Sequence, residues 1–248
     1  MSHTLAVDVG NSRLKWALVG SRGVLAHGAV PNAEIGSLAV RDWQNLPRPS
    51  RAVGANVAGE AARVRVEGQL SRWRLPVEWI VPTAEACGVR NAYVPPGQLG
   101  ADRWASLVAA RQHVLETGPP QPAVVVNAGT AVTVDALDES GLFRGGVILP
   151  NMRLMLRALA DNTAALKVPP GRHAEFPTNT ADALYSGALQ AVCGAIELAR
   201  ARLPHEGRPA ICFLAGGAAA EIAPHLTAPV ELVDNLVLEG VLVLAGEA

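Results

Sequence analysis

The order of apolar and polar positions predicts that the chain opens with an antiparallel pair of strands. Two apolar runs, Leu5 to Val9 and Leu14 to Val19, flank the polar stretch Gly10-Asn11-Ser12-Arg13. Gly and Asn adopt the backbone angles of tight turns more readily than other residues do. A third apolar run from Val24 to Val30 extends the pair to a three-stranded meander.

The rest of the first half alternates strand and helix, which is typical of a mixed α/β fold. The pattern predicts strands at 51–57 and 76–81, a helix at 60–74 between them, a loop-like stretch at 84–100, and an amphipathic helix that starts at Asp102 and ends before Gly118. The Pro-rich segment that follows, 118–122, separates this half from the next.

The second half begins with a stretch that repeats the organisation of the opening pair. Residues 123–135 contain a β-branched strand, a turn with Gly129 and Thr130, and a second strand. A third strand is expected at 142–149, so the two halves suggest an internal repeat with a ligand between them. The pattern further predicts helices at 152–166 and 178–203, strands at 211–214 and 230–233, and a final helix from Asn235. Between those two strands, a turn at 215–218 is expected to lead into a helix that reaches about His225.

Composition indicates a globular protein of one large domain or two of ordinary size. Of its 248 residues 50% are hydrophobic and 17% are charged, and the formal net charge is −1. This balance argues against nucleic acid or an anionic membrane as a partner. The odd number and wide spacing of Cys87, Cys193 and Cys212 favour a reduced, cytoplasmic protein. No signal peptide or membrane-spanning run is expected.

The opening turn carries groups that suit a polyphosphate. Asp8 ends the first strand, and Ser12 and Lys15 follow it closely. Backbone N–H groups, a hydroxyl and an ammonium group bind phosphate oxygens, and a carboxylate beside them suits magnesium. The same residues also fit an ordinary β-hairpin with a polar tip. The sequence contains neither a Walker-type loop nor a Ser or Cys triad with His, which argues against a P-loop kinase and a hydrolase.

Five short motifs occur along the chain. They are Asp8-Val9-Gly10-Asn11-Ser12-Arg13-Leu14-Lys15, Gly100-Ala101-Asp102-Arg103, Gly129-Thr130-Ala131, Gly145-Gly146-Val147-Ile148-Leu149-Pro150, and Asn179-Thr180 with Gly187. In this order they resemble the motifs of the type III pantothenate kinases, the family that includes the Bvg accessory factors, and the resemblance runs from about residue 4 to the last helix. The resemblance implies an α/β fold of the actin-like, sugar-kinase and Hsp70 type. Its two ribonuclease-H-like halves would be 1–118 and 119–248, with ATP in the cleft between them.

The resemblance also implies which residues contact ATP. In the first half they are Asp8, Val9, Gly10, Asn11, Ser12, Arg13, Leu14 and Lys15, and in the second half Thr130, Gly216 and Gly217. Asp8 is implied to hold Mg²⁺, directly or through water. The Gly pair is implied to let the adenosine lie close to the backbone.

For the acceptor substrate, the resemblance implies contacts between pantothenate and the residues Tyr93, Gly100, Ala101, Asp102, Arg103 and Thr180. Asp102 is implied to be the general base that takes the proton from the pantothenate hydroxyl. Arg103 offers a forked donor for a carboxylate or a phosphate. Simpler alternatives are a Tyr93 that packs on a neighbouring Pro, a Thr180 that only caps a helix, and an Asp102 favoured by the helix dipole.

Two positions depart from the family pattern. Residue 127 is Asn, where the family usually has an Asp that binds an activating monovalent cation, K⁺ or NH₄⁺. Asn127 keeps a carbonyl ligand without the charge, so a weaker dependence on these ions is expected. Residue 151 is Asn, where a Gly usually follows the Pro; because Asn tolerates similar backbone angles, little effect is expected.

Together these features predict an ATP-dependent kinase that converts pantothenate to 4′-phosphopantothenate, the first step of coenzyme A synthesis. The resemblance further implies a homodimer whose interface comes largely from the second half. Two alternatives remain open. One is a non-catalytic nucleotide-binding accessory protein of the same fold, which Asn127 favours, and the other is a kinase for another small hydroxyl compound.

Overall fold

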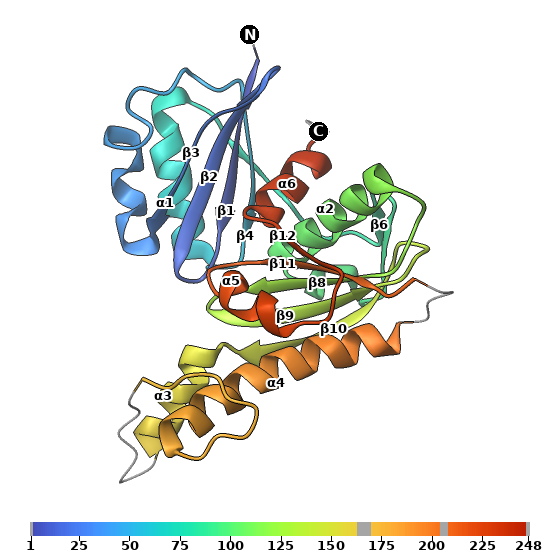
Figure 1. Cartoon of the computed structure of the whole chain (residues 1–248). Coiled ribbons are helices and arrows are strands. Elements are labelled where there is room, and N and C mark those ends of the chain that lie inside the picture. Colours follow the sequence, from blue (N-terminus) through green and yellow to red (C-terminus); the bar gives the residue numbers. More distant parts are fainter. Residues whose placement is uncertain (1, 163–169, 204–207, 247–248) are drawn as a thin grey trace. The chain divides into compact units, whose positions relative to one another are not determined.

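The computed structural model describes residues 2–162, 170–203 and 208–246 (Figure 1). The chain divides into two compact units. Unit 1 comprises Met1–Thr117 and Asn235–Ala248, and unit 2 comprises Gly118–Asp234. The final segment of the chain therefore clusters with unit 1 and not with the second half, to which its place in the sequence assigned it.

Unit 1 is built on a five-stranded sheet with the order β3-β2-β1-β4-β5. The strands are β1 (His3–Val9), β2 (Arg13–Gly20), β3 (Gly23–Pro31), β4 (Arg51–Asn56) and β5 (Val77–Trp79). The first three strands pair antiparallel, and β4 runs parallel to both β1 and β5. The predicted meander and the predicted strand–helix–strand unit are both confirmed.

Helices cover both faces of this sheet because alternate residues of its central strand point to opposite sides. Leu5, Val7 and Val9 of β1 are buried with η1 (Asn32–Val40) and α1 (Glu60–Leu70), which η2 (Ser71–Trp73) extends. Ala6 instead belongs to a core formed with α2 (Ala101–Thr117) and α6 (Leu236–Leu244). Packing of α6 against α2 and β1 explains why the end of the chain belongs to unit 1.

The stretch expected to be a loop at 84–100 contains a short hairpin. Strands β6 (Glu85–Ala86) and β7 (Val89–Asn91) pair antiparallel, and η3 (Pro96–Gln98) follows. Cys87 and Gly88 connect the strands, with φ angles of 49° and 75°. A two-residue turn with two positive φ angles matches the twist of a hairpin. Cys is an unusual residue for this conformation, so the turn carried no clear sequence signal.

Unit 2 repeats the strand order of unit 1. Its strands are β8 (Ala123–Ala128), β9 (Ala131–Leu137), β10 (Leu142–Pro150), β11 (Ile211–Ala215) and β12 (Val230–Leu232). The order β12-β11-β8-β9-β10 has three antiparallel strands at one side and two added parallel strands at the other, as in unit 1. The internal repeat suggested by the two strand–turn–strand stretches is therefore present in the topology.

One face of the unit 2 sheet is covered by helices. These are α3 (Met152–Asn162), α4 (Thr180–Arg202) and α5 (Ala219–Ile222), which η4 (Ala223–His225) extends. Leu189, Val192 and Ile196 of α4 are buried against the sheet. At Gly187 and Gly194 of α4 a Cβ atom would meet nothing within 4 Å in the described chain, so neither glycine mediates close helix packing there. Residues 163–166 of the expected helix lie outside the described residues.

Two further expectations concern cysteines and membranes. Cys193 and Cys212 are buried, whereas Cys87 is exposed, and none of the three is in a disulfide within the described residues. No helix in the described ranges is long and apolar enough to span a bilayer.

Candidate functional site

The polar turn of unit 1 is a short loop, residues 10–12, between β1 and β2. The backbone N–H of Gly10 donates a hydrogen bond to the carbonyl of Arg13 at 3.1 Å, which closes the loop. Val9 and Leu14 on either side have fully buried side chains in the core. These two residues can therefore offer a ligand only their backbone groups, whereas Asn11 and Ser12 are exposed at the tip.

Asp8 lies at the base of this loop, directly opposite Lys15 in the β1–β2 pair. Burial raises the pKa of Asp8 to about 7, and the neighbouring charge of Asp102 adds to the rise, while Lys15 counteracts it. A carboxyl group with such a pKa has a strong tendency to gain a cationic partner or a proton. The base of the loop is thus a site that favours the binding of a cation.

Asp102 occupies the first turn of α2, and Gly100 makes room for it. A Cβ atom at residue 100 would lie 2.6 Å from Oδ1 of Asp102, so a larger residue would displace the carboxylate. Oδ1 accepts a hydrogen bond from the backbone N–H of Arg103 at 2.8 Å. Burial raises the pKa of Asp102, and the N–H and charge of Arg103 oppose that rise. Asp102 is therefore a half-buried carboxylate that lies close to Asp8 and is held in place by the backbone N–H of Arg103.

Arg103 and Tyr93 form a pair beside this carboxylate. Arg103 is only 6% exposed. Its Nη1 donates to the hydroxyl of Tyr93 at 3.3 Å, and its guanidinium carbon lies 5.7 Å from the centroid of the Tyr93 ring. The Tyr93 backbone N–H is held by Oδ1 of Asn91 at 3.0 Å. The structure therefore brings together Asp8, Lys15, Gly100, Asp102, Arg103 and Tyr93 within unit 1.

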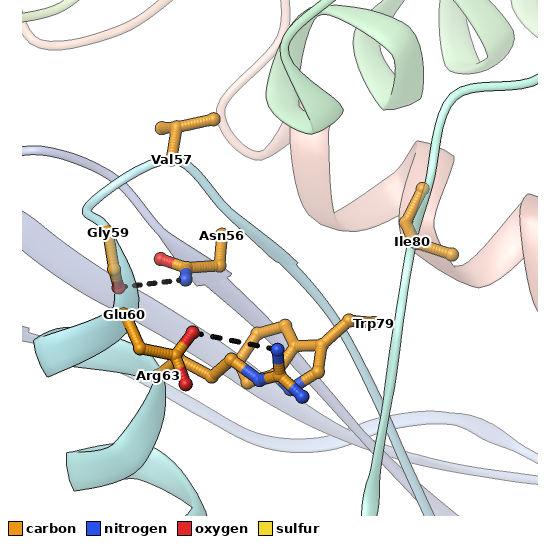
Figure 2. A pocket seen from close by; sticks show the side chains of 7 residues that line it. All are labelled: Asn56, Val57, Gly59, Glu60, Arg63, Trp79 and Ile80. Atoms are coloured by element: carbon orange, nitrogen blue, oxygen red, sulfur yellow. Dashed lines mark hydrogen bonds and ion pairs between the residues drawn. The ribbon is translucent and has the colours of Figure 1, made fainter. Parts of the chain in front are cut away.

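A cavity of about 420 Å³ opens at the ends of β4 and β5 beside the start of α1 (Figure 2). It is lined by Asn56, Val57, Gly59, Glu60, Arg63, Trp79 and Ile80. Asn56 pairs with Val9 of β1, and Val57 lies 3.7 Å from the position of a Cβ at Gly100, so the cavity adjoins the site. Its polar walls are paired internally: Asn56 Nδ2 donates to the Gly59 carbonyl at 3.1 Å (Figure 2).

In unit 2 the equivalent loop, residues 129 and 130, joins β8 to β9. Gly129 N–H donates to the carbonyl of Ala131 at 3.0 Å, and Thr130 is exposed. Gly216 lies against the base of this loop with a φ of 100°, and a Cβ there would come within 2.5 Å of the Ala128 carbonyl. Gly216 is thus required by close backbone packing. At Gly217 a Cβ would meet nothing within 4 Å in the described chain, which leaves this backbone open to a ligand.

Asn127 lies one residue before the end of β8 and pairs with Thr133 of β9. Residues directly opposite in an antiparallel pair place their side chains on the same face. Oγ1 of Thr133 is buried and has no hydrogen-bond partner among the described residues. The Asn127–Thr133 pair therefore brings two neutral side-chain oxygens to one face of the sheet.

Thr180 is the first residue of α4, and its neighbours perform the capping. Asn179 is the N-cap, and its Oδ1 accepts a hydrogen bond from the N–H of Asp182 at 3.0 Å. The N–H of Arg172 and the amide of Asn179 lower the pKa of Asp182. Because Asn179 makes the cap, the exposed hydroxyl of Thr180 is not needed for it.

Sequence reasoning missed two asparagines that bind the loops. Asn32 Nδ2 donates to the carbonyls of Gly10 and Asn11, at 2.8 and 3.0 Å. Asn151 Nδ2 donates to the carbonyl of Gly129 at 2.8 Å. A signal was present, because the third strand of each repeat ends in a Pro that is followed by Asn, at Pro31-Asn32 and Pro150-Asn151.

The metal-binding capacity of the described residues is limited to small sets of ligands. No group of three or more His, Cys, Asp or Glu side chains within them could hold a metal ion by itself. Asp8 instead suits an ion that takes its remaining ligands from water and from a bound phosphate.

Comparison with known proteins gives a consistent result. The family model for type III pantothenate kinase matches residues 4–202. A type III pantothenate kinase from Paracidovorax citrulli is 47% identical, with 98% of both chains covered. Another from Leptothrix cholodnii is 48% identical and covers 98% of this chain and 96% of its own.

Solved structures share the fold at lower identity. A Baf family protein from Campylobacter jejuni superposes with a TM-score of 0.64 at 19% identity, with 98% of each chain covered. The activator of 2-hydroxyisocaproyl-CoA dehydratase from Clostridium difficile, which carries ADPNP, has a TM-score of 0.52 at 10% identity. It covers 96% of this chain and 92% of its own. Together with the repeated sheet topology, these likenesses show the actin-like, sugar-kinase type of α/β fold that the sequence analysis expected.

Proposed function

The chain belongs to the type III pantothenate kinase family, and we propose that it transfers the γ-phosphoryl group of ATP to the hydroxyl of pantothenate. The product is 4′-phosphopantothenate, and the reaction is the first step of coenzyme A synthesis. The observation that carries the assignment of the reacting groups is the Asp8–Asp102 pair of unit 1. Both carboxyl groups have a raised pKa, and they lie close enough that the charge of Asp102 contributes to that of Asp8.

Asp102 is the general base in this proposal. Its raised pKa makes it a better proton acceptor than an ordinary Asp, and the Arg103 N–H holds its orientation. The proton of the pantothenate hydroxyl moves to Asp102 while the hydroxyl oxygen bonds to the γ-phosphorus. The bond from that phosphorus to the β–γ bridging oxygen breaks, and ADP leaves. Such transfers depend mainly on positioning and on neutralising charge.

The proposed ATP contacts in unit 1 are Asp8, Val9, Gly10, Asn11, Ser12, Arg13, Leu14 and Lys15, and in unit 2 Thr130, Gly216 and Gly217. Support comes from the exposed loop tips and from the open backbone at Gly217. The proposed pantothenate contacts are Tyr93, Gly100, Ala101, Asp102, Arg103 and Thr180. Ala101 has a buried side chain, so its contribution would come from the backbone.

Asp8 would hold Mg²⁺, directly or through water. The fit is good because Mg²⁺ usually takes one or two carboxylates and completes its shell with water and phosphate oxygens. When bound, it would neutralise charge on the transferred phosphoryl group. A cation there would also favour the ionised form of Asp8, whose pKa is otherwise raised to about 7.

Asn127 would contribute a carbonyl ligand to a monovalent cation, K⁺ or NH₄⁺. The buried Thr133 hydroxyl on the opposite strand supports such a site, since it lacks a hydrogen-bond partner among the described residues. Two neutral oxygens bind a cation less strongly than a set that includes a carboxylate. We therefore propose a weakened dependence on these ions.

The cellular and oligomeric form is also a matter of proposal, supported by the resemblance to the family. We propose a cytoplasmic homodimer whose interface comes largely from unit 2. Support for the interface is a set of apolar side chains that unit 2 leaves exposed, namely Val147, Ile148, Leu154, Leu159 and Phe176.

One experiment tests the reaction. Purified protein is mixed with ATP, magnesium and pantothenate, with and without potassium, and 4′-phosphopantothenate is sought by mass spectrometry. Formation of the product is expected. Its absence under both conditions would favour the non-catalytic accessory protein, and transfer to other small alcohols but not to pantothenate would favour a different kinase.

The variant Asp102→Asn tests the choice of base. We expect kcat to fall about 10²- to 10⁴-fold, the usual contribution of a positioned base. Glu116→Gln, an exposed carboxylate at the other end of α2, is the matched control and should retain full activity. Full activity of Asp102→Asn would exclude this residue as the base.

A further inference from the structure

Asn32 connects the end of β3 to the loop of unit 1 that comprises residues 10–12. Its side-chain Nδ2 donates to two consecutive carbonyls, those of Gly10 and Asn11, at 2.8 and 3.0 Å. Its backbone N–H donates to the carbonyl of Ser12 at 3.1 Å. All three carbonyls of the loop are therefore bound by one residue. Asn32 is itself held by Arg65 of α1, whose Nη1 donates to the Asn32 carbonyl at 3.0 Å.

Asn151 occupies the equivalent position in unit 2. Each Asn follows a Pro that ends the third strand, and that Pro pairs with the first residue of the second strand: Pro31 with Arg13, and Pro150 with Ala131. Each Asn binds the carbonyl of the glycine that opens the loop, 22 residues earlier in both cases. The contact is thus part of the internal repeat, and it ties both loops in the same way.

These bonds fix the direction of backbone N–H groups. In a planar trans peptide, the C=O and the N–H of the next residue point in opposite directions. Because Asn32 binds the carbonyls of Gly10 and Asn11, the N–H groups of Asn11 and Ser12 point away from Asn32. Successive N–H groups that point to one side form an anion-binding nest. In the same way, Asn151 directs the N–H of Thr130 away from itself.

We propose that Asn32 and Asn151 are positioning residues for the nucleotide phosphates, each of which aligns the N–H groups of one loop. The inference rests on the proposed function, because it takes the two loops to be ATP contacts. Neither side chain need touch the nucleotide. Each acts through the peptide groups that it orients.

Asn151 also offers a way to separate this role from a purely structural one. Its Oδ1 accepts a hydrogen bond from the N–H of Leu154 at 2.8 Å and so caps α3. Asp is as good an N-cap as Asn, and its charge suits the start of a helix. The variant Asn151→Asp therefore keeps the cap but loses the donor to Gly129 and places a carboxylate oxygen against its carbonyl.

The experiment compares the binding of ATP and of adenosine. Affinities are measured by calorimetry for ATP with magnesium, and by competition for adenosine, on native protein, Asn32→Asp and Asn151→Asp. We expect the Kd for ATP to rise about tenfold or more for Asn32→Asp, which loses two bonds, and about fivefold for Asn151→Asp, which loses one. The Kd for adenosine should stay within about twofold, because adenosine lacks the phosphates.

Kinetics give a second readout. The KM for ATP should rise in both variants while the KM for pantothenate stays near the native value. Asn45→Asp is the control, because it makes the same change at an exposed position of unit 1 and should match the native protein. If Asn32→Asp does not fold, Asn32→Ala removes the same two bonds without adding a charge, and a rise in the Kd for ATP alone is again expected.

Three results would overturn the proposal. One is an unchanged Kd for ATP in both variants. Another is a parallel loss of ATP and adenosine binding together with a lower melting temperature, which a merely structural role would produce. The third is a rise in the KM for pantothenate equal to that for ATP. Failure of the proposed function gives a different result, since native protein would then bind no ATP or form no 4′-phosphopantothenate.

Discussion

Asp8 gives the molecule a pH dependence that can be measured without substrate. Its pKa is about 7 in the folded protein, against an ordinary value of 3.8. Between these two values the folded state binds more protons than the unfolded state, so the stability of the ligand-free protein falls as pH rises from about 4 to 7. The stabilisation that comes from protonated Asp8 is complete below the unfolded-state pKa of 3.8 and is lost above the folded-state pKa of about 7.

The variant Asp8→Asn should remove this dependence. At pH 8 the free energy of unfolding of this variant should exceed that of the native protein by an amount on the order of 1–3 kcal/mol. This range allows for the partial exposure of Asp8. At pH 4 the two proteins should be nearly equal. Chemical denaturation at several pH values provides the measurement, and parallel profiles for both proteins would show that Asp8 is not buried as described.

Asp8 also predicts the pH dependence of nucleotide binding. If ionised Asp8 holds Mg²⁺, protons compete with the metal below about pH 7. The Kd for ATP with magnesium should therefore rise as pH falls from 8 to 6, by up to about tenfold per unit below the pKa. A flat profile in the native protein would argue against this role. In Asp8→Asn the Kd for ATP with magnesium should be high and should not change with pH.

Asn127 predicts a response to potassium. In Asn127→Asp the added charge should lower the half-saturating concentration of K⁺ for activity and deepen the dependence on it, because a carboxylate binds a cation more strongly than an amide. Activity is measured against K⁺ concentration at constant ionic strength. Equal activation of native protein and variant at the same half-saturating concentration would contradict the weakened site.

Single residues differed in how well the sequence revealed them. Asp8 and Asp102 were recognised as candidates because they lie in local motifs. The hydrogen bonds of Asn32 and Asn151 were not predicted because each reaches a carbonyl 22 residues away. Asn at residue 151 was expected to have little effect because it tolerates the backbone angles of Gly, and among described residues other than Gly only Arg74 and Cys87 have positive φ. Its effect comes from the side chain.

At the scale of elements, the close contact between α2 and α6 limits residue 240 of α6 to glycine. A Cβ at Gly240 of α6 would lie 1.8 Å from the carbonyl oxygen of Ala105 in α2. Gly240→Ala should therefore force the helices apart and destabilise unit 1 by about 1–3 kcal/mol, or more if the backbone cannot shift. Thermal unfolding provides the measurement, with an expected decrease of several degrees.

The control for this prediction is Gly68→Ala. Gly68 lies in α1 of the same unit, is exposed, and has nothing within 4 Å of its would-be Cβ in the described chain. Because Ala is a better helix former than Gly, this variant should gain up to about 1 kcal/mol. A loss of stability in both variants would show that the effect at Gly240 is not one of packing.

Elements were predictable where their periodicity was local. Strands β1, β2, β8 and β9 follow directly from apolar runs, and Asn179 marks the start of α4. The helix from Asp102 was expected to be amphipathic, yet residues 103–111 of α2 are buried on all sides and Leu115 is 44% exposed. Burial on several faces depends on partners such as α6, which come from distant sequence. The short helix η1 gave no periodic signal.

At the scale of the whole molecule, the repeat explains why the sequence carried so much of the fold. Two stretches of similar pattern each predicted three antiparallel strands, and the two further strands predicted in each half join their sheet in parallel. The assignment of the last helix could not be predicted in the same way. Asn235 to Ala248 follows the second repeat in sequence, and only tertiary packing on β1 and α2 places it in unit 1.

The exposed apolar surface of unit 2 leads to a prediction about assembly. Burial of such side chains from water is favourable, and large exposed apolar areas commonly mark contacts with another protein. Leu154 of α3 is 48% exposed. In light scattering at micromolar concentration, native protein should show twice the 25.8 kDa mass of one chain. Leu154→Glu should show a monomer, because a charge would be buried in the interface.

The fold of that variant should remain intact, since Glu is a good helix former and Leu154 lies in the first turn of α3, where negative charge is favourable. Val64→Glu is the control, because Val64 is 57% exposed on a helix of unit 1. It should remain a dimer. A monomeric native protein would contradict the proposed assembly. A dimeric Leu154→Glu would show that the interface does not include the exposed face of α3.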